Sequence, residues 1–202
     1  MTTPPSQITT PEVFIVESLD MKNERAGCHD GKLLFDTLVL YGRKPQYYYF
    51  RTTRELRELS KIFRDSGYRY LHLSCHGSTS NLEFTFGSVT FVEFAQTFED
   101  KLEHRRMFIS GCELGNIDFA SALFDKNGGM YSLTGPTKKV FFDQALTFWN
   151  SFYYLMDSID PMYMKKDAID SVLNKICPLF EIEIGHFYKS TAHSGTLIKQ
   201  TF

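Results

Sequence analysis

The sequence predicts an α/β protein in which helices cover a mainly parallel β-sheet. Short β-branched or aromatic runs alternate along the chain with amphipathic segments of helical spacing, which is typical of parallel strands joined by crossover helices. A length of 202 residues fits one domain. The 19 Phe, 11 Tyr and 1 Trp supply ample apolar area for a single packed core. We therefore expect one α/β sandwich.

The first elements follow from short apolar runs. Residues 1–12 are rich in Thr and Pro, and we expect a flexible lead-in there. Val13–Ser18 is apolar and β-branched, which predicts a buried strand. Leucines at helical spacing predict a helix over Lys32–Tyr41. Three consecutive tyrosines favour a second strand over Gln46–Arg51.

An amphipathic helix and a third strand come next. Apolar side chains at helical spacing predict a helix over Thr53–Asp65, with Ile62 among those facing the core. We expect Thr53 to cap its start and Gly67 to end it. Tyr70–Cys75 is then the third strand.

A small excursion separates the third strand from the fourth. Alternating apolar residues over Leu82–Phe91, with a turn at Gly87-Ser88, predict a hairpin outside the main sheet. A helix is expected over Val92–Glu103, and Arg106–Gly111 is the fourth main strand.

The last third continues the alternation of helices and strands. We expect helices over Ile117–Asp125, Phe141–Asp157 and Lys165–Cys177, and strands over Met130–Gly135 and Phe180–Tyr188. The resulting single domain spans residues 13–190, and residues 191–202 are expected to be a C-terminal tail.

Charge and cysteine usage exclude several function classes. With 22 Lys and Arg against 24 Asp and Glu, the chain has no excess of positive charge to bind nucleic acid or an anionic membrane. The uncharged apolar run Gln144–Met156 is too short to span a bilayer. The start MTTPPSQITTP lacks the basic and apolar regions of a signal peptide, and the four cysteines form no CxxC. We expect a cytoplasmic protein with reduced thiols.

Two reactive side chains fall at predicted strand ends. His76 follows the third strand and Cys112 follows the fourth, and each has a glycine beside it. If these strands are parallel neighbours, their carboxyl ends meet at one edge of the sheet, where α/β proteins bind ligands. A thiol beside an imidazole is the basic unit of cysteine nucleophilic catalysis. The helix expected to begin near Asn116 or Asp118 would favour a thiolate at Cys112.

The segments around these residues resemble a known family. LHLSCHG (Leu71–Gly77) and FISGCELGN (Phe108–Asn116) are similar to the two signature segments of the CHAT branch of the caspase-like cysteine peptidases, in the clan of caspases and separases. Thr134–Met156 is similar to the strand, loop and aromatic helix that follow in that family. The resemblance covers Val13 to Cys177, and one departure is Leu114, where the family often has Thr.

The resemblance implies a caspase-like three-layer α/β/α sandwich with a His76–Cys112 dyad. Cys112 would be the nucleophile of an endopeptidase acting on a protein, and the N–H groups of Gly77 and Cys112 would form the oxyanion hole. No cofactor or metal is required. By analogy with small stand-alone bacterial members, we expect an effector of antiviral defence or regulated cell death, with an activating partner or complex as a further possibility.

Other interpretations remain open at this point. The acids Glu113 and Asp118 either stabilise the start of the next helix or line a substrate pocket that selects a basic residue. A family member without activity would be a binding or scaffold subunit of an effector complex. An acyltransferase or redox sensor would use Cys112 without cleaving peptides.

Two further groupings of Cys and His are weaker candidates for chemistry. A zinc site of His72, Cys75, His76 and Cys112 matches no known ligand spacing, and His72 and Cys75 lie on opposite strand faces. Cys75 is expected in the core. The adjacent Cys28 and His29 are expected at the surface without a role.

Overall fold

A nine-stranded sheet forms the centre of the molecule. The computed structural model describes residues 9–190 and 195–202. Its strands are β1 (Thr10–Ser18), β2 (Gln46–Tyr49), β3 (Tyr68–Gly77), β4 (Asn81–Phe84), β5 (Gly87–Thr90), β6 (Arg106–Ile109), β7 (Ser132–Pro136), β8 (Ile184–Lys189) and β9 (Leu197–Thr201). Its helices are α1 (Met21–Ala26), α2 (Asp30–Leu40), α3 (Thr53–Ser66), α4 (Phe91–Thr97), α5 (Ile117–Lys126), α6 (Phe142–Ile159) and α7 (Lys166–Phe180).

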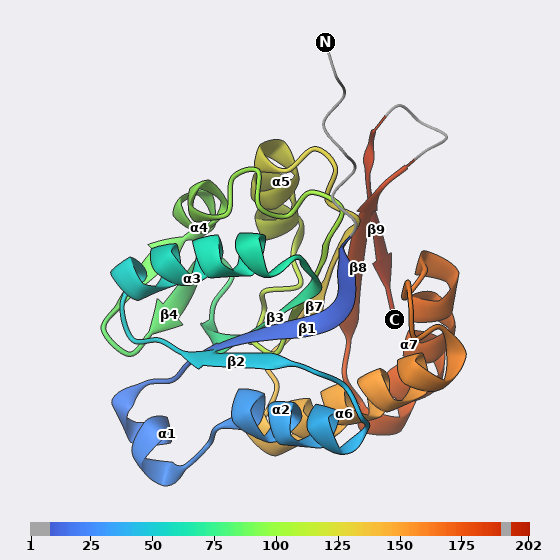
Figure 1. Cartoon of the computed structure of the whole chain (residues 1–202), viewed down its shortest axis with the longest axis horizontal. Coiled ribbons are helices and arrows are strands. Elements are labelled where there is room, and N and C mark those ends of the chain that lie inside the picture. Colours follow the sequence, from blue (N-terminus) through green and yellow to red (C-terminus); the bar gives the residue numbers. More distant parts are fainter. Residues whose placement is uncertain (1–8, 191–194) are drawn as a thin grey trace.

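The strand order is β2-β1-β3-β6-β7-β8-β9. The pairings from β2 to β7 are parallel, whereas β8 and β9 are antiparallel to their neighbours. Helices α3, α4 and α5 cover one face, and α2 and α6 lie on the other side of the sheet (Figure 1). The predicted three-layer α/β sandwich around a mainly parallel sheet is confirmed.

Each face of the sheet packs its own apolar core, because successive side chains on a strand point to opposite faces. Leu71, Leu73 and Cys75 of β3 belong to the core under α3, α4 and α5. Tyr70 belongs to the opposite core, where Trp149 of α6 is buried. None of the helices in the described residues is long and apolar enough to cross a membrane.

The sheet extends past both ends of the expected domain. β1 begins at Thr10, whose N–H donates to the Gly67 carbonyl at 2.8 Å, so residues 10–12 belong to the sheet and not to a lead-in. Residues 1–8 and 191–194 lie outside the described residues. Within the expected tail, β9 pairs with β8, and Leu197 and Phe202 pack against the two cores. The tail prediction was therefore wrong for Leu197–Thr201.

The predicted hairpin is present with a different turn. β4 and β5 are antiparallel, and Thr85 and Phe86 connect them, whereas Gly87 begins β5 with a φ of 113°. β4 also pairs with the end of β3, opposite His76 and Gly77. The hairpin therefore projects from the carboxyl edge of the sheet.

The start of α3 and the end of α4 differ from the sequence prediction. Thr52, not Thr53, caps α3: its hydroxyl accepts the Glu55 N–H, and the Glu55 carboxylate accepts the Thr52 N–H. Gly67 ends the helix in the left-handed conformation, as predicted, but Ile62 is exposed. α4 is shorter than expected and ends at Thr97.

Candidate active site

The carboxyl edge of the sheet brings His76 and the Cys112 loop together. β3 and β6 are parallel neighbours, and the Ser110 N–H donates to the Leu73 carbonyl at 2.9 Å just beyond the last paired residues. A β-carbon placed on Gly77 would lie 2.7 Å from the Cys112 carbonyl oxygen. The two strand ends are therefore in van der Waals contact at the point where both reactive side chains emerge.

The His76 ring is held from two sides. Its Nε2 lies 2.9 Å from Asn23 Nδ2 and 3.3 Å from Asp20 Oδ2, both at the start of α1. The ring also meets the edge of Phe142 at the start of α6, with centroids 5.5 Å apart. The side chain keeps 27% exposure, so it is fixed in orientation and still open to solvent.

The Cys112 sulfur contacts the backbone of the loop between β7 and α6. Sγ accepts the Val140 N–H and donates to the Val140 carbonyl, both at 3.4 Å. Val140 is two residues before Phe142, so the side chains of His76 and Cys112 both meet the segment that leads into α6. The two contacts hold the Cys112 sulfur against this backbone segment.

The loop after Cys112 is hydrogen-bonded to the backbone between β7 and α6. The Glu113 N–H donates to the Lys138 carbonyl at 3.2 Å and the Gly115 N–H to the Pro136 carbonyl at 2.7 Å. Glu113 adopts a φ of 60°, in the left-handed region that non-glycine residues rarely enter.

The candidate oxyanion donors point away from competing acceptors. Bonded and non-bonded pairs alternate in an antiparallel ladder, and Ser78 donates its N–H to Asn81. The neighbouring pair Gly77–Leu82 is then non-bonded, so the Gly77 N–H points away from β4. The Cys112 N–H has no hydrogen bond to any described residue. Gly77 must be glycine, since a β-carbon would also lie 2.5 Å from the Leu114 side chain.

The two acids near Cys112 occupy different positions. Glu113 directly follows the cysteine and is half-buried. Asp118 is exposed in the first turn of α5, where a negative charge suits the helix dipole. Asn116 caps that helix by accepting the Phe119 N–H at 2.9 Å, in agreement with the expected helix start.

A buried polar layer lies beneath His76 on the same face of the sheet. The Glu17 carboxylate is fully buried and accepts hydrogen bonds from the Gly31 N–H at 2.7 Å and the Tyr47 hydroxyl at 2.6 Å. His29 Nδ1 lies 3.2 Å from the same carboxylate, so the His29 ring, which was expected at the surface, is partly covered by this layer. Asp30 accepts from the Ser74 hydroxyl at 2.6 Å, and burial next to Glu17 raises the pKa of Asp30 to about 7.

His72 and Cys75 are core residues on opposite faces. His72 is fully buried, with hydrogen bonds to Tyr153 at 3.1 Å and Ser110 at 2.8 Å, and burial lowers its pKa to about 3. Cys75 is buried on the other face, where desolvation raises the pKa of its thiol. No group of three or more Cys, His, Asp or Glu in the described residues is arranged to hold a metal ion.

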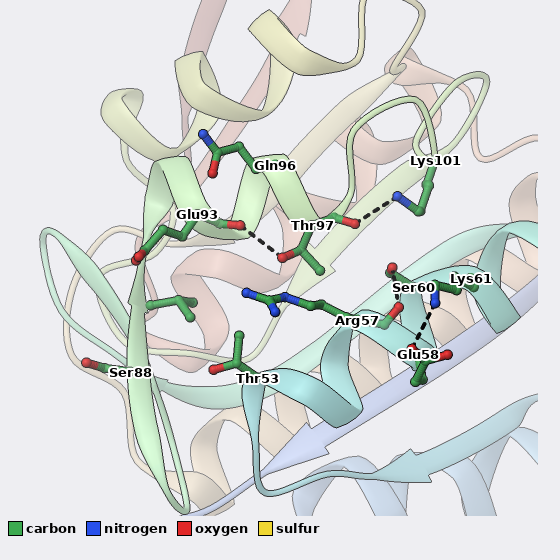
Figure 2. Close-up of a pocket in the computed structure, with 11 residues that line it drawn as sticks. Thr53, Arg57, Glu58, Ser60, Lys61, Ser88, Glu93, Gln96, Thr97 and Lys101 are labelled. Carbon is green, nitrogen blue, oxygen red and sulfur yellow. Dashed lines mark hydrogen bonds and ion pairs between the residues drawn. The ribbon is translucent and has the colours of Figure 1, made fainter.

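A surface pocket lies elsewhere, between α3, β5 and α4. It encloses about 580 Å³ and neither His76 nor Cys112 lines it. Figure 2 shows Arg57 extending from α3 into it, toward Glu93 and Thr97 of α4. Lys61 is paired with Glu58 at 2.8 Å, and Lys101 donates to the Thr97 carbonyl. The pocket is lined by hydroxyl and charged side chains but by no cysteine or histidine.

Two solved structures with a similar fold are cysteine proteases. The chain is similar to a secreted C11 cysteine protease from Bacteroides thetaiotaomicron in complex with an irreversible peptide inhibitor, with a TM-score of 0.59 and 6% identity over 89% of this chain and 66% of that one. It is also similar to the Arg-specific cysteine proteinase gingipain R, with a TM-score of 0.56 and 12% identity over 84% of this chain and 43% of that one.

These likenesses show the fold, and the chain spans about two thirds of the length of that C11 protease. No protein-family model and no curated protein matches the sequence.

Sequence reasoning missed the residues that hold the two reactive side chains. Asp20 and Asn23 belong to α1, a six-residue helix that buries no side chain and so has no hydrophobic pattern. The local signal available was Asp20, a favoured capping residue, placed before the helix-forming stretch MKNERA. Val140 contacts Cys112 only through its backbone, which no residue pattern reveals.

Proposed function

We propose that this protein is a cysteine endopeptidase with His76 and Cys112 as its catalytic dyad. The observation that carries the proposal is the convergence of these two residues at the ends of the neighbouring strands β3 and β6. Gly77 lies against the Cys112 backbone there. The side chains of His76 and Cys112 contact Phe142, the first residue of α6, and Val140 just before it. The fold shared with C11 proteases and gingipain supports the same reaction class.

The proposed mechanism is nucleophilic catalysis through a thioester. Cys112 gives up its thiol proton to His76, and its sulfur attacks the scissile carbonyl carbon. The N–H groups of Gly77 and Cys112 hold the negative oxygen, and His76 gives a proton to the leaving amine. Water then hydrolyses the thioester, which restores the thiol.

The finer assignment is to the CHAT branch of caspase-like peptidases, as an effector in bacterial defence or regulated cell death. The segments LHLSCHG and FISGCELGN support it. The four cysteines are free, which fits a reducing cytoplasm, although the C11 protease from Bacteroides thetaiotaomicron is secreted. We propose a protein substrate and no cofactor, with an activating partner as a possible requirement.

Of the two acids, Glu113 is the better candidate for a substrate contact. It follows the nucleophile and is half-buried, whereas Asp118 is already explained by the dipole of α5. A carboxylate at this place would favour a substrate with a basic residue near the scissile bond. Gingipain R, which has the same fold, is Arg-specific.

The decisive experiment maps new protein N-termini in cells that express the wild type or Cys112→Ala. We expect a set of cleavage sites that share one sequence class and are absent with Cys112→Ala. The matched control is Cys28→Ala, because Cys28 is also partly exposed and contacts Asn23 through its backbone N–H, which alanine keeps. Identical maps for the wild type and Cys112→Ala, with both proteins folded, would refute the endopeptidase and favour a scaffold subunit.

A further inference from the structure

Two adjacent arginines at the start of β6 are buried in different ways. Arg105 and Arg106 are only 1% and 9% exposed. The three guanidinium nitrogens of Arg105 each donate to a backbone carbonyl, at distances of 2.8 to 3.0 Å. Arg106 makes one hydrogen bond, from Nη1 to the Ser132 hydroxyl at 2.9 Å, and its buried Nε has no partner. Arg105 is therefore a satisfied structural cation, whereas Arg106 is not.

The charge of Arg106 also lacks a counter-ion. No carboxylate of the described residues forms an ion pair with it, and residues 1–8 and 191–194 contain no Asp or Glu. Burial is the main cause that lowers the pKa of Arg106, and Asp160 opposes this effect from beyond the distance of an ion pair. The Asp160 carboxylate already accepts the N–H groups of Tyr163 and Lys165. Buried charges are normally paired, so Arg106 is missing a partner.

Arg106 lines a surface pocket of about 420 Å³ at the amino end of β6, the opposite end from Cys112. The end of β8 and the start of α7 form further walls of this pocket. The Arg106 guanidinium carbon lies 5.2 Å from the centre of the Tyr131 ring, and Lys166 Nζ lies 4.8 Å from the centre of the Tyr188 ring. Two cations are thus held against tyrosine rings in the walls of one pocket.

The start of α7 adds partial positive charge to the same pocket. Its first-turn residues Lys166 and Asp167 line the pocket, and the capping residue Lys165 offers no side-chain hydrogen bond to the free N–H groups of that turn. Such a helix start favours an anion. The local acids do not fill this place, because Asp170 is bound to Lys166 and the Asp167 side chain is 99% exposed.

The buried ring of His186 lies within reach of the same two cations. Burial lowers the pKa of His186 to about 3, and the charges of Arg106 and Lys166 lower it further in the same direction. The ring is therefore neutral, with Nδ1 3.2 Å from the Thr134 hydroxyl. The positive charge in this region comes from Arg106 and Lys166, which both line the pocket.

We propose that this pocket binds a phosphate group, with Arg106 as its principal ligand and Lys166 and the start of α7 as further contacts. A guanidinium donates charge-assisted hydrogen bonds to phosphate oxygens, and a dianion matches two cations beside a helix start. The pocket is larger than a bare phosphate ion, so it also has room for the organic part of a small phosphate ester. This site is separate from the proposed dyad and does not depend on peptidase activity.

The first test is isothermal titration calorimetry of the full chain in chloride buffer with inorganic phosphate, phenyl phosphate and benzoate. We expect both phosphates to bind and benzoate, which has the same ring with a carboxylate, to bind at least about 10-fold more weakly than phenyl phosphate. Tighter binding of phenyl phosphate than of inorganic phosphate identifies an ester as the ligand, and equal binding identifies the free ion. Benzoate binding as tight as that of phenyl phosphate, or no binding of either phosphate, would overturn the proposal.

The second test places the bound phosphate at Arg106. Arg106→Gln should weaken binding at least about 10-fold, because it removes the charged donor. Tyr131→Glu, at an exposed position, keeps Arg106 but sets a carboxylate beside it, and should also prevent binding. This second variant keeps the test open if Arg106→Gln does not fold.

The matched control is Arg57→Gln, which removes an exposed positive charge from the pocket between α3, β5 and α4 (Figure 2). We expect this variant to bind phosphate as the wild type does. Unchanged binding in folded Arg106→Gln or Tyr131→Glu, or an equal loss in Arg57→Gln, would mean an adventitious ion only and would overturn the proposal. Circular dichroism of each variant shows whether it is folded.

Discussion

The two faces of the central sheet differ most at its carboxyl edge. Under α3, α4 and α5, β3 contributes Leu71, Leu73 and Cys75, and the face stays apolar up to the last buried residue. Under α2 and α6, the same strand contributes His72 and Ser74, which are buried and hydrogen-bonded, and then His76. The candidate catalytic residues thus emerge above the polar face.

This difference shows how one strand serves stability and chemistry together. On the apolar face, the buried side chains of β3 need no hydrogen-bond partners. Their removal from water therefore carries little desolvation penalty. The polar face must satisfy each buried group, and Ser110, Tyr153 and Asp30 supply the partners. Such a network orients the backbone that carries His76 and Cys112.

The largest contrast is expected between the two cysteines at this edge. Cys112→Ala should lower kcat/KM for peptide cleavage by at least about 10³-fold, because the nucleophile is removed. Cys75→Ala should keep activity and cost about 1 kcal/mol of stability through a small cavity. A peptidase assay and urea unfolding of both variants check this. Loss of activity in Cys75→Ala but not in Cys112→Ala would contradict the assignment of Cys112 as the nucleophile and Cys75 as a core residue.

The second contrast concerns the buried histidine. His72→Leu should destabilise the protein by about 3 kcal/mol, because it leaves the Ser110 and Tyr153 hydroxyls buried without this partner. Adding Tyr153→Phe should recover part of the loss, as one of the orphaned groups disappears. Urea unfolding measures both values. Stability equal to the wild type in His72→Leu would show that the polar layer is dispensable.

The third contrast uses pH to probe the buried carboxyl. The pKa of Asp30 is raised to about 7 from 3.8, so the folded state holds its proton more tightly than the unfolded state. The stability from this group is complete below pH 3.8 and is lost as pH rises through 7. Asp30→Asn removes that loss, so at pH 8 it should exceed the wild type by up to about 4 kcal/mol.

The comparison of Asp30→Asn with the wild type must therefore depend on pH. The difference between the two unfolding free energies should shrink as pH falls toward 4. Thermal unfolding of both proteins across this range measures it. A constant difference at all pH values would mean that the Asp30 carboxyl stays ionised in the folded protein.

The smallest change in stability is expected at the N-terminal cap of α3, the helix that covers the apolar face of the sheet. Thr52→Ala should cost about 1 kcal/mol because it breaks the capping box of α3. Thr53→Ala, inside the helix, should cost less than half of that. Chemical unfolding of the two variants separates them, and equal losses would contradict the assigned cap.

The sequence was informative wherever a pattern repeats along an element. Strand alternation and helical spacing located the main strands and most helices, and Gly67 marked the end of α3. The ambiguity between Thr52 and Thr53 arose because both are good caps, and only the Glu55 contact decides between them. The short strand β9 was missed because its apolar residues are few and its partner β8 is needed to order it.

The reactive side chains of the candidate site could be predicted from the sequence, but the residues that contact and orient them could not. His76 and Cys112 stand at strand ends with glycines beside them, which local sequence reveals. The contact between Asn23 and His76 joins residues 53 positions apart, and it forms only when α1 folds over the sheet edge. The acid pair Glu17 and Asp30 is likewise a product of packing, since neither position is marked as buried by its own residue type.

The most direct test of the central claim is covalent labelling with a peptide acyloxymethyl ketone, followed by mass spectrometry of all four cysteines. The account predicts one adduct, on Cys112, that forms rapidly in the wild type and slowly in His76→Ala. Labelling of Cys28, Cys75 or Cys177 in preference to Cys112 would contradict the dyad. So would a rate at Cys112 that does not depend on His76.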